Sequence, residues 1–109
     1  MARADELQAA IRELLASARQ HTLAEMFKLA DDAGLQDADW QAWRQRGRDY
    51  RSWQRMGAAA PEAIDLASTL ARQLPDSLHP LGDTERAAFE RQVNDMLVDL
   101  YREFLDSKG

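Results

Sequence analysis

Arginine and tryptophan are concentrated in one short stretch of this chain. Residues 40–57 hold all three tryptophans, one of the two tyrosines and five of the twelve arginines. Five arginines against Asp49 give the stretch a charge of +4, so the rest of a chain with net charge −5 carries −9. Guanidinium groups bind carboxylates and phosphates, and aromatic side chains line pockets for apolar ligands. These residues are therefore the first candidates for a binding site.

Helical spacing divides the stretch into two faces. The aromatic and apolar residues recur at three- and four-residue steps, which places them on one side of a helix. This aromatic stripe consists of Trp40, Trp43, Gly47, Tyr50, Trp53 and Met56. The same steps place four basic residues on another side. This arginine face consists of Arg44, Arg48, Arg51 and Arg55.

The aromatic stripe has two interpretations. It is either plain core between neighbouring helices or the wall of a cleft for a hydrophobic or peptide-like ligand. In the second case, an arginine such as Arg51 or Arg44 would orient a polar group of the ligand. The predicted ligand-binding residues are Trp40, Trp43, Arg44, Tyr50, Arg51, Trp53, Met56 and Tyr101.

The arginine face also has two interpretations. It is either a solvated surface paired with the many Asp and Glu side chains of neighbouring helices, or a surface for an anionic partner such as a phosphate or an acidic protein. Direct nucleic-acid binding by this chain is not expected, because the rest of the chain is acidic overall, with a charge of −9.

Catalytic and metal-binding patterns are missing from the sequence. There is no cysteine, and the two histidines, His21 and His79, have no second ligand at metal spacing. Neither a nucleophile elbow nor a glycine-rich phosphate loop occurs. We therefore predict that the chain is not an enzyme and that it uses no metal and no cofactor.

The elements that position these residues are predicted to be helices. A first helix covers about residues 2–33 and ends at Gly34, and its apolar face could serve dimerisation or a partner helix. The basic, aromatic helix follows at about 38–56, capped by Asp37 or Asp39 and ended by Gly57.

Two further helices complete the chain. Pro61 suits the first turn of a helix whose predicted buried residues are Ile64, Ala67, Leu70, Ala71 and Leu74. Asp83 or Thr84 caps a last helix with the strongest apolar periodicity. Its predicted buried residues are Phe89, Val93, Met96, Leu97, Leu100, Tyr101, Phe104 and Leu105.

The predicted class is an all-α single domain over residues 1–109, a compact bundle of four to five helices with short loops. We expect helix over more than about 65% of the residues, because no segment shows strand alternation. No apolar run reaches the ~18 residues of a membrane span and no signal peptide is visible. These features, together with the lack of cysteine, predict a cytoplasmic protein without a membrane partner.

The middle of the chain resembles the C-terminal effector domains of bacterial MerR-type transcription regulators, of the helical, thiostrepton-recognition kind. Trp40 opens a helix that ends at Met56, and Pro61 leads the next helix with spaced alanines at Ala67 and Ala71. The first helix is similar to the end of the dimerisation helix of such regulators. The resemblance implies binding of small hydrophobic or peptide-like compounds by an aromatic pocket wall, in a homodimer. Because no helix-turn-helix unit is present in the sequence, the resemblance is to an isolated effector domain or to a free-standing relative of such domains.

These observations predict a small-molecule-binding helical effector domain with a regulatory role. The alternative is a protein–protein interaction module that uses the N-terminal helix and the arginine face.

Overall fold

The computed structural model describes residues 2–108, and its ordered elements are four α-helices and one 3₁₀ turn. They are α1 (Ala2–Ala33), α2 (Asp37–Arg55), α3 (Pro61–Ala71), η1 (Asp76–Leu78) and α4 (Asp83–Lys108). Helix covers 85% of the described residues, and none of them is in a strand. The predicted all-α bundle of four to five helices with short loops is confirmed.

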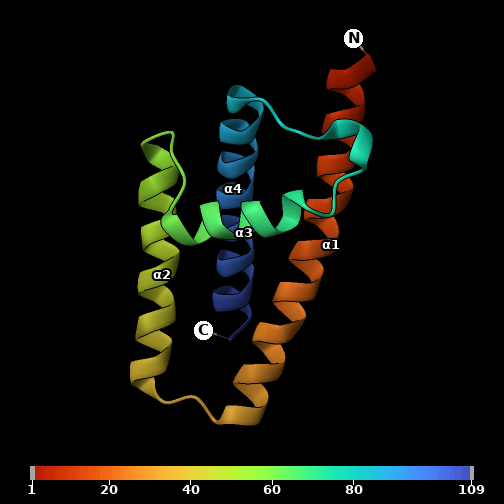
Figure 1. Cartoon of the computed structure of the whole chain (residues 1–109). Helices are drawn as coiled ribbons and strands as arrows, with labels where there is room; N and C mark the ends of the chain where they lie inside the picture. The colour runs from red at the N-terminus through yellow and green to blue at the C-terminus, as the bar shows by residue number, and fades with distance from the viewer. Residues whose placement is uncertain (1, 109) are drawn as a thin grey trace.

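The last helix, α4, lies at the centre of the bundle. Figure 1 shows α1 and α2 on either side of it and α3 crossing over it, and α4 contacts all three. Because it is covered from several directions, it is buried over more of its circumference than an amphipathic stripe requires. Its buried residues are Phe89, Val93, Asn94, Met96, Leu97, Val98, Leu100, Tyr101 and Phe104. The predicted stripe is confirmed except for the half-buried Leu105, while Asn94 and Val98 were not predicted.

Two glycines end helices as predicted. Gly34 follows α1 with φ of 58°, and Gly57 follows α2 with φ of 70°. Side chains other than glycine rarely adopt this left-handed backbone, so both positions favour glycine. Between its ends α1 runs without interruption through His21 and Thr22, as predicted.

The predicted helix caps were wrong by one to three positions. Gln36 precedes α2, and its backbone N–H donates to the Asp39 carboxylate at 2.9 Å. Gly82 precedes α4 in the same way, and its N–H donates to Glu85 at 2.8 Å. In both helices a carboxylate in the first turn reaches back to the residue before the helix. Asp39 therefore acts from inside α2, and neither Asp83 nor Thr84 is the residue before α4.

The buried face of α3 differs from the predicted one at three positions: Ala63 is buried although it was not predicted, Ile64 is exposed, and Ala71 is only half-buried. Ala63 and Ala67 lie against α4 and are fully buried, whereas Ile64 is 40% exposed. Small side chains let two helices cross at short range, so the two alanines occupy the contact between α3 and α4. Ile64 lies at the edge of that contact. The prediction that Ile64 is buried was wrong for this reason.

A buried asparagine joins three helices. Asn94 on α4 donates from Nδ2 to the backbone oxygen of Tyr50 on α2, at 3.0 Å. Its Oδ1 accepts from the backbone N–H of Ala60, the residue before α3, also at 3.0 Å. Burying a side-chain amide costs little free energy when both its NH₂ group and its oxygen are hydrogen-bonded. Asn94 therefore sets where the α2–α3 turn lies on α4.

Tyr50 makes the stability of the fold sensitive to alkaline pH. Its ring is 7% exposed, and burial, helped by nearby Tyr101, raises the pKa of the Tyr50 phenol from 10.0 to about 12. The folded state therefore favours the neutral phenol. The contribution of this group to the stability of the fold is complete below pH ~10 and is lost as the pH rises toward ~12. We expect this ionisation to remove up to ~2–3 kcal/mol of unfolding free energy.

The Tyr50 prediction is checked by urea unfolding at a series of alkaline pH values. Tyr50→Phe keeps the ring and removes the ionisable group, so its unfolding free energy should fall less steeply above pH ~10 than that of the unchanged protein. Parallel curves for the two proteins would show that the Tyr50 phenol is not the group responsible.

Candidate functional site

Two tryptophans of the predicted site pack around a phenylalanine of α4. The ring centroid of Phe104 lies 5.6 Å from that of Trp40 and 4.7 Å from that of Trp43. Phe27 of α1 approaches the same ring to 5.0 Å. The space between these side chains is therefore filled by Phe104 rather than left open for a ligand.

The two tyrosines of the predicted site meet in the core. Tyr50 and Tyr101 are both buried, and their ring centroids are 5.3 Å apart. Trp53 is half-buried and lines, with Tyr50, a hollow of about 260 Å³ beside Pro61 at the start of α3. This hollow is larger than the one of about 110 Å³ that Gly47 of the aromatic stripe lines.

The other predicted site residues lie elsewhere on α2. Met56 follows the last residue of the helix and is 65% exposed. Arg44 and Arg51 are both exposed, and Arg51 lines a hollow of about 110 Å³ against α4 with Arg102. The structure thus brings Trp40 to Trp43 and Tyr50 to Tyr101, but it does not bring Met56 or Arg44 to either pair.

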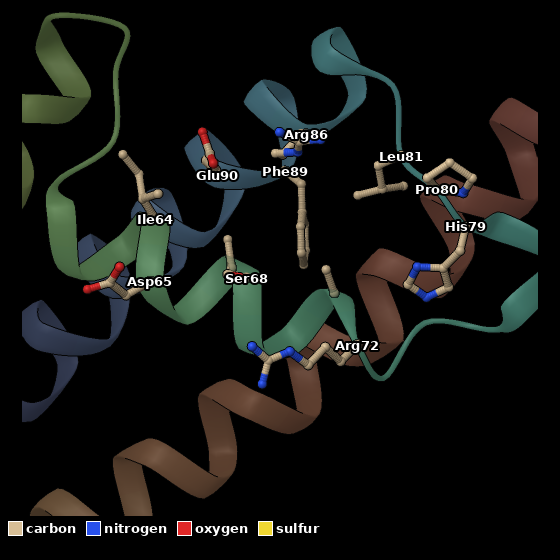
Figure 2. A pocket seen from close by; sticks show the side chains of 12 residues that line it. Ile64, Asp65, Ser68, Arg72, His79, Pro80, Leu81, Arg86, Phe89 and Glu90 are labelled. Carbon is tan, nitrogen blue, oxygen red and sulfur yellow. The ribbon is translucent and has the colours of Figure 1, made fainter.

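A larger hollow, which the sequence did not indicate, lies between α3, the segment 79–81 and the first half of α4. This α3–α4 groove has a volume of about 500 Å³, and Figure 2 shows its side chains. The lining residues are Ile64, Asp65, Ala67, Ser68, Ala71, Arg72, His79, Pro80, Leu81, Arg86, Phe89 and Glu90.

The middle of the groove is apolar. Phe89 is only 1% exposed and stands between Leu81 on one side and Ile64 on the other (Figure 2). Ala67 and Ala71 leave room along α3 because their side chains end at Cβ. Ile64 is one of three large hydrophobic side chains identified as exposed on the described part of the chain. A ligand in the groove would remove its surface from water, which is favourable.

Charged side chains stand around this apolar middle. Arg72 directly follows α3 and Arg86 belongs to α4, while Asp65 and Glu90 lie near Ile64 (Figure 2). Within residues 2–107, the side chains of Arg72, Asp65 and Glu90 make no hydrogen bond or ion pair, and Arg86 approaches Asp83 no closer than 4.0 Å. The edges of the groove therefore offer both cationic and anionic groups to a ligand.

His79 is held in place at one end of the groove. A ring nitrogen, Nε2, lies 3.1 Å from the backbone oxygen of Leu74. His79 is exposed, and its ring carries this hydrogen bond. The bond fixes the ring at the edge of the groove, where it presents a flat, polarisable surface.

One signal on α3 could have pointed to the groove. Ile64, Ala67, Ser68 and Ala71 recur at helical spacing and form a second face beside the buried one. A mixed face with one large apolar residue and three small ones is typical of a surface that leaves space. The segment 79–81, which forms another wall of the groove, carries no such periodicity. The sequence therefore does not show where this segment lies.

Within residues 2–108, none of the helices combines the length and the apolar character needed to cross a membrane. The same part of the chain contains no group of three or more His, Cys, Asp or Glu side chains placed to hold a metal ion.

No family model, curated protein or solved structure matches the chain. Function therefore has to be inferred from the chemistry of its own surfaces.

Proposed function

We propose that this chain is a small-molecule-binding helical domain with a regulatory role, and that a hydrophobic or peptide-like compound occupies the α3–α4 groove. The observation that carries this proposal is the shape and lining of the groove. This hollow of about 500 Å³ has an apolar middle and charged groups at its edges, among them the side chains of Asp65, Arg72 and Glu90, which are unpaired within residues 2–107. Ligand pockets have volumes of ~300–1,000 Å³ and combine apolar walls with a few placed polar groups.

The groove suits a ligand better than the aromatic stripe does. The aromatic rings of the stripe already contact other rings: Trp40 and Trp43 pack on Phe104, and Tyr50 packs on Tyr101. Opening a cleft between them would expose that surface and lose its contacts. The α3–α4 groove needs no such opening, because Ile64 is already exposed.

The regulatory role rests on the resemblance to MerR-type effector domains and on the position of the groove. Its walls come from α3, the 79–81 segment and α4, so one ligand would contact three parts of the chain. A ligand that binds only this arrangement stabilises it, by about 2.7 kcal/mol at a hundred times the dissociation constant. Another protein could then bind the stabilised arrangement of α3, segment 79–81 and α4.

The proposal is tested by filling the groove. Ser68 is exposed, lines the groove and contributes nothing to the core, so Ser68→Trp should add bulk to the hollow without disturbing the fold. We expect the unchanged protein to bind the apolar anionic dye 1-anilinonaphthalene-8-sulfonate saturably. The groove-filled variant should bind it at least tenfold more weakly, which is ~1.4 kcal/mol. Dye emission, excited outside tryptophan absorption, measures both.

Two further variants make the result specific. Thr69 is exposed on the same helix and does not line the groove, so Thr69→Trp should bind the dye as the unchanged protein does. Trp53→Ala tests the aromatic stripe and should fold, because a half-buried ring loses less than about 2 kcal/mol. If Trp53→Ala loses the dye while Ser68→Trp keeps it, the ligand lies on the aromatic stripe and the groove proposal is wrong.

A further inference from the structure

The arginine face, defined above as Arg44, Arg48, Arg51 and Arg55, is unpaired. All four side chains are exposed, and within residues 2–107 none of them makes an ion pair. Arg48 donates only to the neutral side chain of Gln45, at 2.7 Å. The pairing with carboxylates of neighbouring helices, which one sequence interpretation required, is therefore missing from this part of the chain.

Two other arginines of the protein do form ion pairs, and both of them join α1 to α4. Arg3 joins the start of α1 to Glu85 at 3.0 Å. Arg19 joins the middle of α1 to Asp99 and Glu103 on α4, at 2.9 and 2.8 Å. Three acidic side chains of α4, those of Glu85, Asp99 and Glu103, are thus paired with α1, which lies on the opposite side of α4 from α2 (Figure 1).

The surface beside the arginine face is also basic. Arg51 and Arg102 line one hollow between α2 and α4, together with Gly47 and Leu105. Asp106 lines the same hollow but lies beyond ion-pair distance of either arginine. Asp95, further along α4, is bonded to the neutral Gln54 at 2.9 Å. Arg102 therefore extends the arginine face onto α4.

The size of this surface limits what it can bind. Eleven residues separate Arg44 from Arg55, which corresponds to about 17 Å along a helix. Charges that close repel one another, and a carboxylate-bearing partner would relieve the repulsion while forming paired N–H···O bonds with each guanidinium. A long polyanion is disfavoured, because it would run beyond the face onto a chain whose other residues sum to −9.

We propose that the arginine face and Arg102 form a docking surface for a short acidic segment of a partner protein. Glutamate or aspartate side chains repeated at three- and four-residue steps along a partner helix would match the spacing of the four arginines. The surface is separate from the α3–α4 groove, since it lies on α2 and the second half of α4. A protein that senses a compound in the groove could therefore bind its partner here.

The test uses a fluorescein-labelled helical peptide with four glutamates at that spacing. At low ionic strength we expect saturable binding that weakens as salt is added, because exposed charges are screened beyond about 10 Å at 0.1 M. The double reversal Arg48→Glu with Arg51→Glu should weaken binding at least tenfold. Fluorescence anisotropy reports the binding, and unchanged thermal unfolding midpoints verify the fold of each variant.

A matched control separates a defined surface from net charge. Arg12 on α1 and Arg91 on α4 are exposed and lie outside the arginine face, so Arg12→Glu with Arg91→Glu changes the net charge equally. This control should keep at least a third of the peptide affinity. Equal losses for the two double variants, or no binding by the unchanged protein, would overturn the proposal. So would a short DNA duplex that binds more tightly than the peptide and is lost on reversal of Arg48 and Arg51.

Discussion

Replacing Phe104 by alanine is expected to lower the free energy of unfolding by ~3–5 kcal/mol. Phe104 is fully buried, and its ring packs against three others, those of Phe27, Trp40 and Trp43. Removing it takes away a large buried apolar surface and leaves a cavity that three rigid rings cannot easily fill. Because domains of this size are stabilised by only ~5–15 kcal/mol, the loss should be evident in a urea melt.

Tryptophan emission adds a second readout for Phe104→Ala. Two of the three tryptophans touch the Phe104 ring, so their emission should change in the folded variant. Leu100→Ala is the control, because Leu100 is equally buried on α4 but is not part of this ring cluster. It should cost ~2–5 kcal/mol while leaving native emission nearly unchanged. A Phe104→Ala variant as stable as the unchanged protein would mean that Trp40 and Trp43 do not pack as core.

Asn94 is expected to tolerate neither alanine nor aspartate. Asn94→Ala leaves the buried N–H of Ala60 without its acceptor and deprives the Tyr50 oxygen of a donor. Unsatisfied buried groups cost ~1–3 kcal/mol each, so we expect a total loss of ~2–4 kcal/mol. Asn94→Asp should be worse at neutral pH, because it places a carboxylate in a fully buried position beside a carbonyl oxygen.

The pH dependence of Asn94→Asp makes this prediction specific. Burial favours the neutral acid, so the folded-state pKa of the new carboxyl should lie above the unfolded value of ~3.9. A raised pKa means that stability is retained at low pH and lost as the pH rises. Relative to Asn94→Ala, the aspartate variant should therefore gain stability on acidification, when its protonated carboxyl can both donate and accept. Identical pH profiles for the two variants would show that residue 94 does not bond both Tyr50 and Ala60.

Asn94 also connects stability to the proposed ligand site. Its bond to Ala60 holds the residue before α3, and α3 forms one wall of the α3–α4 groove. A variant that loosens this bond should weaken dye binding even though residue 94 does not line the groove.

Local chemistry allowed much of the fold to be predicted from the sequence. Gly34, Gly57 and Pro61 each impose a backbone geometry that ends or begins a helix whatever lies around it. The apolar period of α4 is long enough that its buried face could be assigned without knowing its partners. The candidate site was less predictable, because helical spacing shows which residues share a face but does not show what covers that face.

Two neighbouring residues illustrate this limit. Ala63 and Ile64 are both compatible with an apolar face on α3, and hydrophobicity alone favours the isoleucine. Only the crossing of α3 over α4 makes the smaller residue the buried one. The same crossing leaves Ile64 at the edge of the α3–α4 groove, so a single error about packing also hid the candidate site.

The sequence by itself determined the all-α class, the glycines that end α1 and α2 and the two faces of α2, because these depend on contacts within a few residues. Tertiary structure alone decided that Phe104 fills the space between Trp40 and Trp43 and that Asn94 joins α2 and α3 to α4. It also decided that segment 79–81 closes a groove against α3. The physical reason is that cavities and buried hydrogen bonds depend on how helices far apart in the chain cross, and no local periodicity encodes that crossing.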